Sequence, residues 1–381
     1  QMVAGSDDPK LISGTFDWVY EEELGLRNGL RFSPNSQKLA FWQLDSNGVP
    51  IQTMIDNTSE RYAKTIEFAY PKVGQTNSAA KVGVWDRTRK KTVWLDLPGD
   101  PRENYIAAVD WLPSEFAHAN ERLLIQQLNR KQNQNHVYLC DVETGHCVNI
   151  HTEVSDAWVR HLRELHWLPG SVFAGDASDN SSPRLLWLSE RSGWQHIEAI
   201  EIPSPESLEE ESNLPSRITP VTGGSWDVIS IAVVAKDGSH IDFIASPEQP
   251  SQRALYRVSL EQGLSGQLAT TPERVSPDEG GTFSYSISPT AEYAVESWSD
   301  FNSAPQQRLV QLDPYKRLKA FDDNEKLDEN LEKLAPVHTE FLRLPIGEFA
   351  DDPASKDMEL DVWIMMPVGE DNSIESLAPK S

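Results

Sequence analysis

One short phrase recurs along this chain, and it constrains the fold more than any other feature. The phrase consists of an apolar or aromatic residue, any residue, a proline, a turn and then an apolar stretch. Its copies are RFSPNSQKLAFWQL (31–44), VDWLPSEFAHANERLLIQQL (109–128), LHWLPGSVFAGDASDNSSPRLLWLSE (165–190), YSISPTAEYAVESW (285–298) and the degenerate IAVVAKDGSHIDFIAS (231–246). Such internal self-similarity is the sequence signature of a repeat architecture.

Each copy is followed by a second apolar stretch that ends in a turn. This pattern predicts pairs of β-hairpins, because apolar alternation bounded by Gly, Pro, Asp and Asn is typical of strands. Four short strands repeated about every 45–75 residues indicate the blades of a β-propeller. We therefore expect an all-β fold, with about five blades between residues 28 and 320. The 12 Trp and 12 Phe residues suit the gaps between adjacent blades.

The repeats do not account for the ends of the chain. Residues 316–336 have helical spacing, with Leu327, Leu331 and Leu334 on one face, and residues 338–369 resemble a strand, a loop and a second strand that begin a new domain. The predicted organisation has three parts: a leading segment (1–27), the propeller blades (28–320), and a helical linker with the first strands of another domain (321–381).

The net charge of −25 limits the partners of the chain. Such an acidic surface repels phosphate backbones and anionic membranes, so we expect no nucleic-acid partner, whereas cationic ligands are compatible with it. No run of about 18 apolar residues is present. Neither a metal nor a cofactor is expected.

The two cysteines, Cys140 and Cys147, flank a stretch that resembles a hairpin turn, YLCDVETGHC (138–147). A cross-strand disulfide between them requires an oxidising compartment. Two free thiols in neighbouring strands are the alternative, and the sequence leaves both open. Without further Cys or His partners, the pair does not make a zinc site.

A run of three glutamates, Glu21–Glu23, lies in the stretch DWVYEEELGL (17–26). One interpretation is a short helix with Asp17 as its N-cap, in which early carboxylates favour the positive end of the helix dipole. The other starts from the repulsion between neighbouring carboxylates, which is relieved when a cation lies between them. The α-ammonium group of a peptide is such a cation, and two carboxylates can accept its N–H groups in charge-assisted hydrogen bonds. Such a pair would recognise where a peptide begins.

The stretch DWVYEEE (17–23) resembles the double-glutamate signature of the dipeptidyl peptidase IV family, within the prolyl oligopeptidase class of serine peptidases. Further stretches resemble family phrases in the family's order: FSPNSQKLAFWQLDSNGVP (32–50), FAYPKVGQTNSAAKVGVW (68–85), LNRKQNQNHVYLCD (128–141), LLWLSERSGWQHI (185–197), GGSWDVISI (223–231) and GTFSYSISPTAEYAVESWSD (281–300). The resemblance covers roughly residues 12–366 and is specific when the motifs are taken together.

The resemblance implies an eight-bladed N-terminal β-propeller that caps a C-terminal α/β-hydrolase domain. It also implies that a short helix carries two glutamates that hold the α-ammonium group of the substrate. By their place in the motif these are Glu22 and Glu23, and Trp18 and Tyr20 would brace the helix. The implied activity is removal of N-terminal dipeptides, often with Pro or Ala second, through an acyl-enzyme at a Ser-His-Asp triad.

A second stretch, WVRHLR (158–163), resembles a family segment that lines the deeper side of the substrate site. Leu162 and Arg163 are therefore candidate substrate contacts. The alternative is an arginine that stands in solvent at a blade edge.

The chain departs from the family in its catalytic residues. The family's catalytic Ser belongs to a G-x-S-x-G motif, which is absent here, and GGSWD (223–227) lacks the final glycine. Since the chain starts at Gln1 and stops at Ser381, where the hydrolase sheet would follow, we expect a fragment with no catalytic residues and no activity by itself. A propeller with about five of eight blades leaves two open sheet edges, so we also expect poor solubility or edge association.

Three other interpretations stay open. The chain is a stand-alone β-propeller that binds proteins, or it belongs to another clan member such as an acylaminoacyl peptidase, or the acidic run is purely structural. The glutamate pair argues against the second. The partners implied for the parent are peptide N-termini and its own α/β-hydrolase domain, and a homodimeric parent is left open. A periplasmic or extracellular location is inferred from Cys140 and Cys147 and from the family's frequent export.

Overall fold

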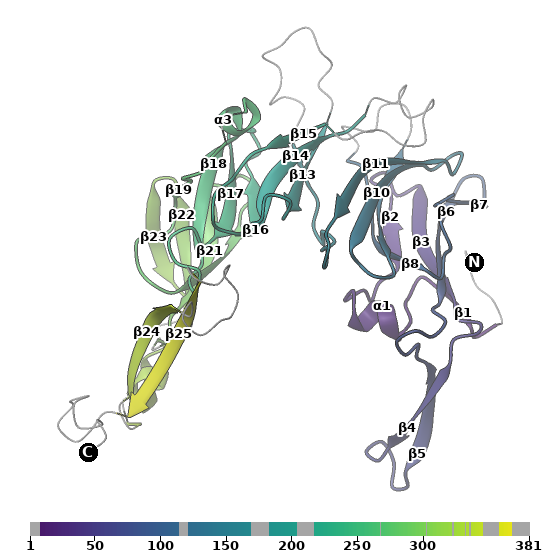
Figure 1. The fold of residues 1–381 in the computed structure, drawn as a ribbon, viewed down its shortest axis with the longest axis horizontal. Coiled ribbons are helices and arrows are strands. Elements are labelled where there is room, and N and C mark those ends of the chain that lie inside the picture. The colour runs from purple at the N-terminus through teal and green to yellow at the C-terminus, as the bar shows by residue number, and fades with distance from the viewer. Residues whose placement is uncertain are drawn as a thin grey trace. The chain divides into compact units, whose positions relative to one another are not determined.

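The computed structural model describes residues 8–113, 121–168, 183–203, 217–266, 268–301, 303–321, 324–331, 333–334, 337–345 and 358–367. Most of these residues lie in short strands, as Figure 1 shows. The chain divides into two compact units, which we describe separately. The first holds residues 1–165, 182–185 and 200–218, and the second holds 166–181, 186–199 and 219–381.

Five sheets make up most of the described fold. The first has the order β1-β3-β6-β7, with β2 also paired to β3: β1 (Leu11–Ser13), β2 (Leu30–Phe32), β3 (Lys38–Asp45), β6 (Ala79–Asp86) and β7 (Lys91–Trp94). The second has the order β11-β10-β9-β8: β8 (Asn104–Trp111), β9 (Arg122–Asn129), β10 (Gln134–Asp141) and β11 (Cys147–Val154).

The other three sheets each hold four strands in sequence order. The third is β12 (His166–Leu168), β13 (Arg184–Ser189), β14 (His196–Glu201) and β15 (Ile218–Pro220). The fourth is β16 (Val228–Val234), β17 (His240–Ala245), β18 (Ala254–Ser259) and β19 (Glu273–Arg274). The fifth is β20 (Thr282–Ile287), β21 (Tyr293–Ser299), β22 (Gln306–Leu312) and β23 (Tyr315–Ala320). Repeated four-stranded antiparallel sheets of this kind are consistent with propeller blades. The prediction of a fold built mostly from β-strands is therefore confirmed.

The recurring Ser-Pro phrase forms the turn between two neighbouring strands. In the first copy the backbone N–H of Ser33 donates to the carbonyl of Lys38 at 2.9 Å, and the Ser33 hydroxyl accepts from the Lys38 N–H at 2.9 Å. In the fourth copy Ser288 and Tyr293 make the same two contacts, at 2.8 and 3.2 Å. The third residue after the serine has a φ of 59° in both copies. In these two copies the serine thus satisfies the same backbone groups of the turn.

Two hairpins and two further helices lie outside the five sheets. The pair β4 (Ile51–Asp56) and β5 (Lys64–Ala69) projects from the first unit (Figure 1). In the second unit β24 (Val337–Pro345) pairs along its whole length with β25 (Glu359–Pro367). The helices are α3 (Leu260–Leu264) and α4 (Glu325–Leu331). The strand pair expected within residues 338–369 is thus present, whereas the β4–β5 hairpin was not anticipated.

The helical spacing predicted for residues 316–336 is wrong over its first part. Residues up to Ala320 belong to β23, which pairs with β22, and only Glu325–Leu331 is helical. Helical spacing is a weak local signal that tertiary context overrides, and here β22 supplies a neighbouring strand for these residues to pair with. The side chains predicted as an apolar face stay exposed, by 45% at Leu327, 41% at Leu331 and 64% at Leu334.

The core of the first unit joins the glutamate segment to the first two sheets. Tyr20 and Leu24 from that segment pack in one buried cluster with Trp42, Val82 and Ile125 from the sheets. The indole N–H of Trp42 also donates to the carbonyl of Ile106, at 3.0 Å. The segment before the first predicted blade is therefore built into the sheet core, and this fixes the position of the glutamates.

The core of the second unit lies among its own sheets. Phe243 of β17, fully buried, packs in one cluster with Ile197 of β14 and Phe283 of β20. Its ring is stacked at 6.2 Å from that of Trp226. Large apolar side chains thus fill the space between sheets, as the aromatic content indicated.

Candidate functional site

Helix α1 (Trp18–Glu22) carries the acidic run, and its start is capped as predicted. The side chain of Asp17, in extended conformation, accepts the backbone N–H of Tyr20 at 3.1 Å. Its second oxygen accepts the hydroxyl of Ser78 at 2.7 Å. Asp17 is buried, so these bonds tie the start of the helix to the turn before β6. The N-cap is confirmed.

The two aromatic residues of the motif hold the helix from either side. Tyr20 is buried, its ring stacks on Phe16 with centroids 5.5 Å apart, and its hydroxyl oxygen accepts the backbone N–H of Ile106 at 3.0 Å. Burial raises the pKa of Tyr20 far above its ordinary value, so the phenol stays neutral. The Trp18 ring packs on Tyr70 at 4.2 Å. Both side chains therefore position α1, in line with the bracing role expected of them.

Replacing Tyr20 by phenylalanine should destabilise the protein by about 1–3 kcal/mol, because the buried N–H of Ile106 loses its acceptor while the ring packing is kept. The matched control is Tyr105→Phe. The Tyr105 ring lies 6.0 Å from that of Tyr20, but its hydroxyl makes no hydrogen bond to the part of the chain that the structure describes. Urea unfolding measures both variants, and equal losses of stability would contradict this role for the Tyr20 hydroxyl.

Glu22 and Glu23 lie at the end of α1, not at its start. Glu22 is the last helical residue, and Glu23 is the C-cap, with its N–H bonded to the carbonyl of Val19. Both side chains are exposed, and neither makes an ion pair with any residue the structure describes. The last turn contains no basic residue, and only Glu21 lies in the first turn.

This placement separates the two interpretations of the acidic run. A helix dipole favours carboxylates at its N-terminus and disfavours them at its C-terminus, by about 0.3–1 kcal/mol each. The dipole therefore accounts for Glu21 and counts against Glu22 and Glu23. Neither carboxylate makes an ion pair with the described residues, so both are available to a cation from outside them.

Arg163 lies against the end of the same helix. Gly25 follows the glutamates with a φ of +66°, and a Cβ built on it would stand 3.3 Å from Nη2 of Arg163. The arginine is exposed, and burial of His161, together with the charge of Arg163, lowers the pKa of His161. The structure thus brings a guanidinium and the two carboxylates to one end of α1, although they are far apart in the sequence.

The segment that carries Arg163 is held by side chains that the sequence reasoning missed. Gln126 of β9 and Asn135 of β10 are fully buried, and both donate to backbone carbonyls of residues 160–162. For Gln126 the available signal was a pair of amides within the apolar part of the strand RLLIQQLN (122–129). A buried amide in such a strand needs hydrogen-bond partners, but the neighbouring residues in the sequence do not indicate which groups these are.

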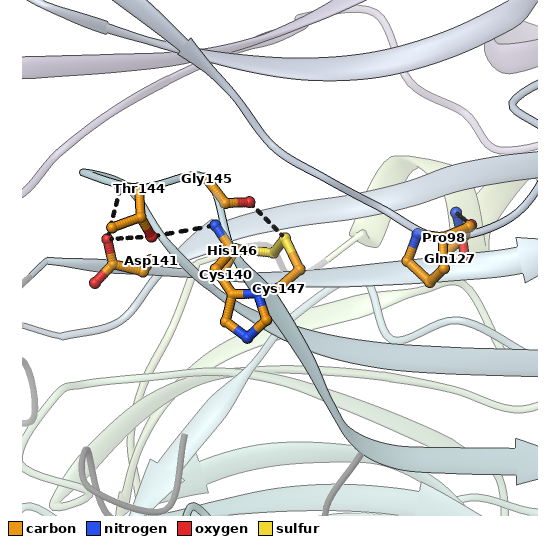
Figure 2. Close-up of a disulfide and its surroundings, with 8 residues drawn as sticks. All are labelled: Pro98, Gln127, Cys140, Asp141, Thr144, Gly145, His146 and Cys147. Carbon is orange, nitrogen blue, oxygen red and sulfur yellow. Dashed lines mark hydrogen bonds between the residues drawn. A yellow bond between two sulfur atoms is a disulfide. The ribbon is translucent and has the colours of Figure 1, made fainter. Parts of the chain in front are cut away.

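Cys140 and Cys147 form a disulfide across β10 and β11, where they are direct partners (Figure 2). The turn between them is closed by Asp141, whose carboxylate accepts the backbone N–H groups of two following residues at 2.8 and 2.9 Å. The carbonyl of Gly145 accepts the N–H of Asp96 at 2.9 Å. The disulfide therefore holds a turn that contacts the segment after β7.

Within the ranges that the structure describes, no group of three or more His, Cys, Asp or Glu side chains is arranged to hold a metal ion. A search of the same residues finds no helix long and apolar enough to cross a membrane.

The repeated four-stranded sheets are consistent with the blades of a β-propeller. The chain belongs to the family described as the dipeptidyl peptidase IV (DPP IV) N-terminal region, which matches residues 1–305.

Named relatives agree with this assignment. A probable dipeptidyl peptidase 4 of Emericella nidulans is 27% identical over 373 residues, which are 95% of this chain and 44% of that protein. The dipeptidyl peptidase 4 of Trichophyton rubrum is 25% identical over 350 residues, 89% of this chain and 41% of the relative. The chain thus spans less than half the length of these relatives.

Solved structures agree on the fold. The crystal structure of Porphyromonas gingivalis dipeptidyl peptidase 4 matches with a TM-score of 0.72 and 22% identity, covering 94% of this chain and 45% of that one. A putative dipeptidyl aminopeptidase IV from Bacteroides ovatus matches with a TM-score of 0.70 and 19% identity, covering 95% and 47%. At these identities the likeness concerns the fold alone.

Proposed function

We propose that this chain is the substrate-gating propeller part of a serine exopeptidase that removes N-terminal Xaa-Pro or Xaa-Ala dipeptides from peptides. In this proposal Glu22 and Glu23 bind the α-ammonium group of the substrate. The observation that carries the proposal is the placement of these two exposed carboxylates at the end of α1 without a cationic partner among the described residues. A bound ammonium group would supply the missing positive charge through charge-assisted hydrogen bonds.

Arg163 completes the proposed binding site. Its guanidinium lies next to Gly25, directly after the glutamates, and it carries several N–H donors. A peptide whose amine is held by Glu22 and Glu23 has its first carbonyl oxygens only a few ångströms away, and these oxygens accept hydrogen bonds. Holding both groups fixes the distance from the N-terminus to the bond that is cut, which is catalysis by proximity and orientation.

The rest of the catalytic machinery is proposed to come from an α/β-hydrolase domain of the longer protein, with the present five sheets as part of an eight-bladed propeller. Exposed apolar side chains on β24 and β25 support this. They include Phe341, Leu360 and Trp363, at 52%, 50% and 44% exposure. A hairpin with this much exposed apolar surface is suited to burial under a further layer of structure. By itself the chain is expected to be catalytically inactive.

Location is part of the proposal. The Cys140–Cys147 disulfide supports a periplasmic or extracellular protein, since such bonds persist in oxidising compartments.

The proposal is tested with the full-length protein and a pair of chromogenic substrates that differ only at the amine. Gly-Pro with a free amine should be cleaved, and its N-acetyl form should lose at least about 100-fold in kcat/KM, because acetylation removes the charge that Glu22 and Glu23 bind. Equal turnover of both substrates would rule out amine recognition. A stand-alone protein-binding propeller, the second candidate, predicts cleavage of neither substrate.

A further inference from the structure

The segment 160–163 contains no helix or strand, yet one side chain holds its backbone as a strand neighbour would. Gln126 donates from Nε2 to the carbonyl of Leu162 at 2.8 Å. Its Oε1 accepts the backbone N–H of the same residue, also at 2.8 Å. A carboxamide that both donates to and accepts from one residue reproduces the pairing of two peptide groups. The backbone at Leu162 is thereby fixed at two points.

A second amide supports the first. Asn135, on the neighbouring strand β10, donates from Nδ2 to Oε1 of Gln126 at 3.0 Å and to the carbonyl of Arg160 at 3.4 Å. Both amide side chains have 0% exposure. They cross-link β9 and β10 to the 160–163 segment through a polar network inside an otherwise apolar unit.

This network is not optimised for stability. Oδ1 of Asn135 is buried and has no hydrogen-bond partner in the part of the chain that the structure describes. An unpartnered buried acceptor costs about 1–3 kcal/mol, so an apolar pair of the same size could serve packing as well or better. What an apolar pair could not do is hold the polar backbone of Leu162 in one place.

The fixed position of Leu162 matters because the next residue is Arg163. The guanidinium of Arg163 lies against Gly25, at the end of the helix that carries Glu22 and Glu23. Because Arg163 is exposed and makes no ion pair with the described residues, its own contacts do not fix it. Its backbone, however, directly follows Leu162, which Gln126 holds at two points.

We propose that Gln126, supported by Asn135, is the positioning residue that holds Leu162 and Arg163 opposite the glutamate pair and so sets the affinity for the peptide backbone next to the bound amine. This inference rests on the proposed function of Glu22 and Glu23. Gln126 does not touch substrate. It acts through the segment 160–163.

The test compares Gln126→Leu with Gln127→Leu in the full-length protein, using the free-amine Gly-Pro substrate. Gln127 is the matched control. It is the next residue on β9, it is also buried, and its side chain donates instead to the carbonyl of Pro98. Figure 2 shows Gln127 and Pro98 together. Gln126→Leu should raise KM about tenfold and leave kcat within about threefold, whereas Gln127→Leu should leave KM unchanged. An unchanged KM in folded Gln126→Leu overturns the inference.

A milder variant keeps the test decisive if Gln126→Leu does not fold. Asn135→Ala removes the supporting amide and its unpartnered oxygen but leaves Gln126 in place. It should raise KM about two- to fivefold. A KM equal to that of the unmodified protein would overturn the role of Asn135 and of the network.

A double variant tests the route of action. If Gln126 acts through Arg163, then Gln126→Leu combined with Arg163→Ala should have the same KM as Arg163→Ala alone, since the positioned group is already gone. If the two substitutions raise KM independently, so that their separate effects multiply in the double variant, the inference is overturned.

Glu22→Gln separates the two proposals. If Glu22→Gln leaves KM and kcat unchanged, the proposed recognition of the substrate amine fails, whatever the result for Gln126→Leu. If Glu22→Gln impairs the enzyme but Gln126→Leu does not, only the positioning role of Gln126 fails.

Discussion

Replacing Glu22 or Glu23 by glutamine in the full-length protein should lower kcat/KM for a free-amine dipeptide substrate by about 30- to 1000-fold. This corresponds to about 2–4 kcal/mol of lost transition-state binding, because the substrate ammonium loses a charged acceptor at a site that the proposed hydrolase domain would shield from water. Glutamine keeps the size of the side chain and one acceptor oxygen, so the loss reports the charge itself. Steady-state kinetics with the Gly-Pro chromogenic substrate provide the measurement.

Glu21→Gln is the control for this experiment. It removes the same charge from the same helix, but from the first turn, where the dipole already stabilises a carboxylate. Its kcat/KM should stay within about threefold of the unmodified protein, and its effect should appear as a slight loss of stability. If all three variants are equally impaired, the acidic run acts through general charge and not through a specific pair.

Removing the Cys140–Cys147 disulfide should have the second-largest effect, this time on local stability. The bond closes a short loop, with a sequence separation of 7, and chain-entropy arguments give about 2–3 kcal/mol for a loop of that size. In the double variant Cys140→Ser, Cys147→Ser, we expect backbone amides of β10 and β11 to exchange with deuterium about 30- to 150-fold faster.

Two comparisons make the disulfide experiment specific. Reductant should reproduce the faster exchange in the unmodified chain and have no effect on the double variant. Amides of β21 and β22, which belong to the second unit, should be unaffected in every case. Unchanged exchange in β10 and β11 would mean that the bond does not constrain this turn.

The repeats and the start of the helix could be predicted because each depends on residues close in sequence. Ser33 and Ser288 make their turn contacts within five residues, and Asp17 caps a helix that begins at the next residue. The class of fold followed from these local patterns, since period-two alternation between turns leaves few alternatives to stacked antiparallel sheets. The same local reasoning failed for residues 316–320, where pairing with β22 prevailed over helical spacing.

The site was predictable only in part. The glutamate pair was visible because adjoining carboxylates stand out in any sequence, but the sequence did not say that the pair lies at the unfavourable end of its helix. Resemblance alone pointed to Arg163. The supporting amides Gln126 and Asn135 went unnoticed, because a polar residue within a strand does not reveal which distant backbone it contacts.

The sequence by itself determined the mostly-β class, the repeated Ser-Pro turns, the helix cap and the identity of the charged groups, because these depend on hydrogen bonds and periodicity within a few residues. Tertiary structure alone decided that Arg163 meets Gly25 and that Gln126 pairs with Leu162, which lies 36 residues away. Such contacts depend on the order in which strands pair and on where loops close over them. Those are properties of the packed chain, and no short stretch of sequence carries them.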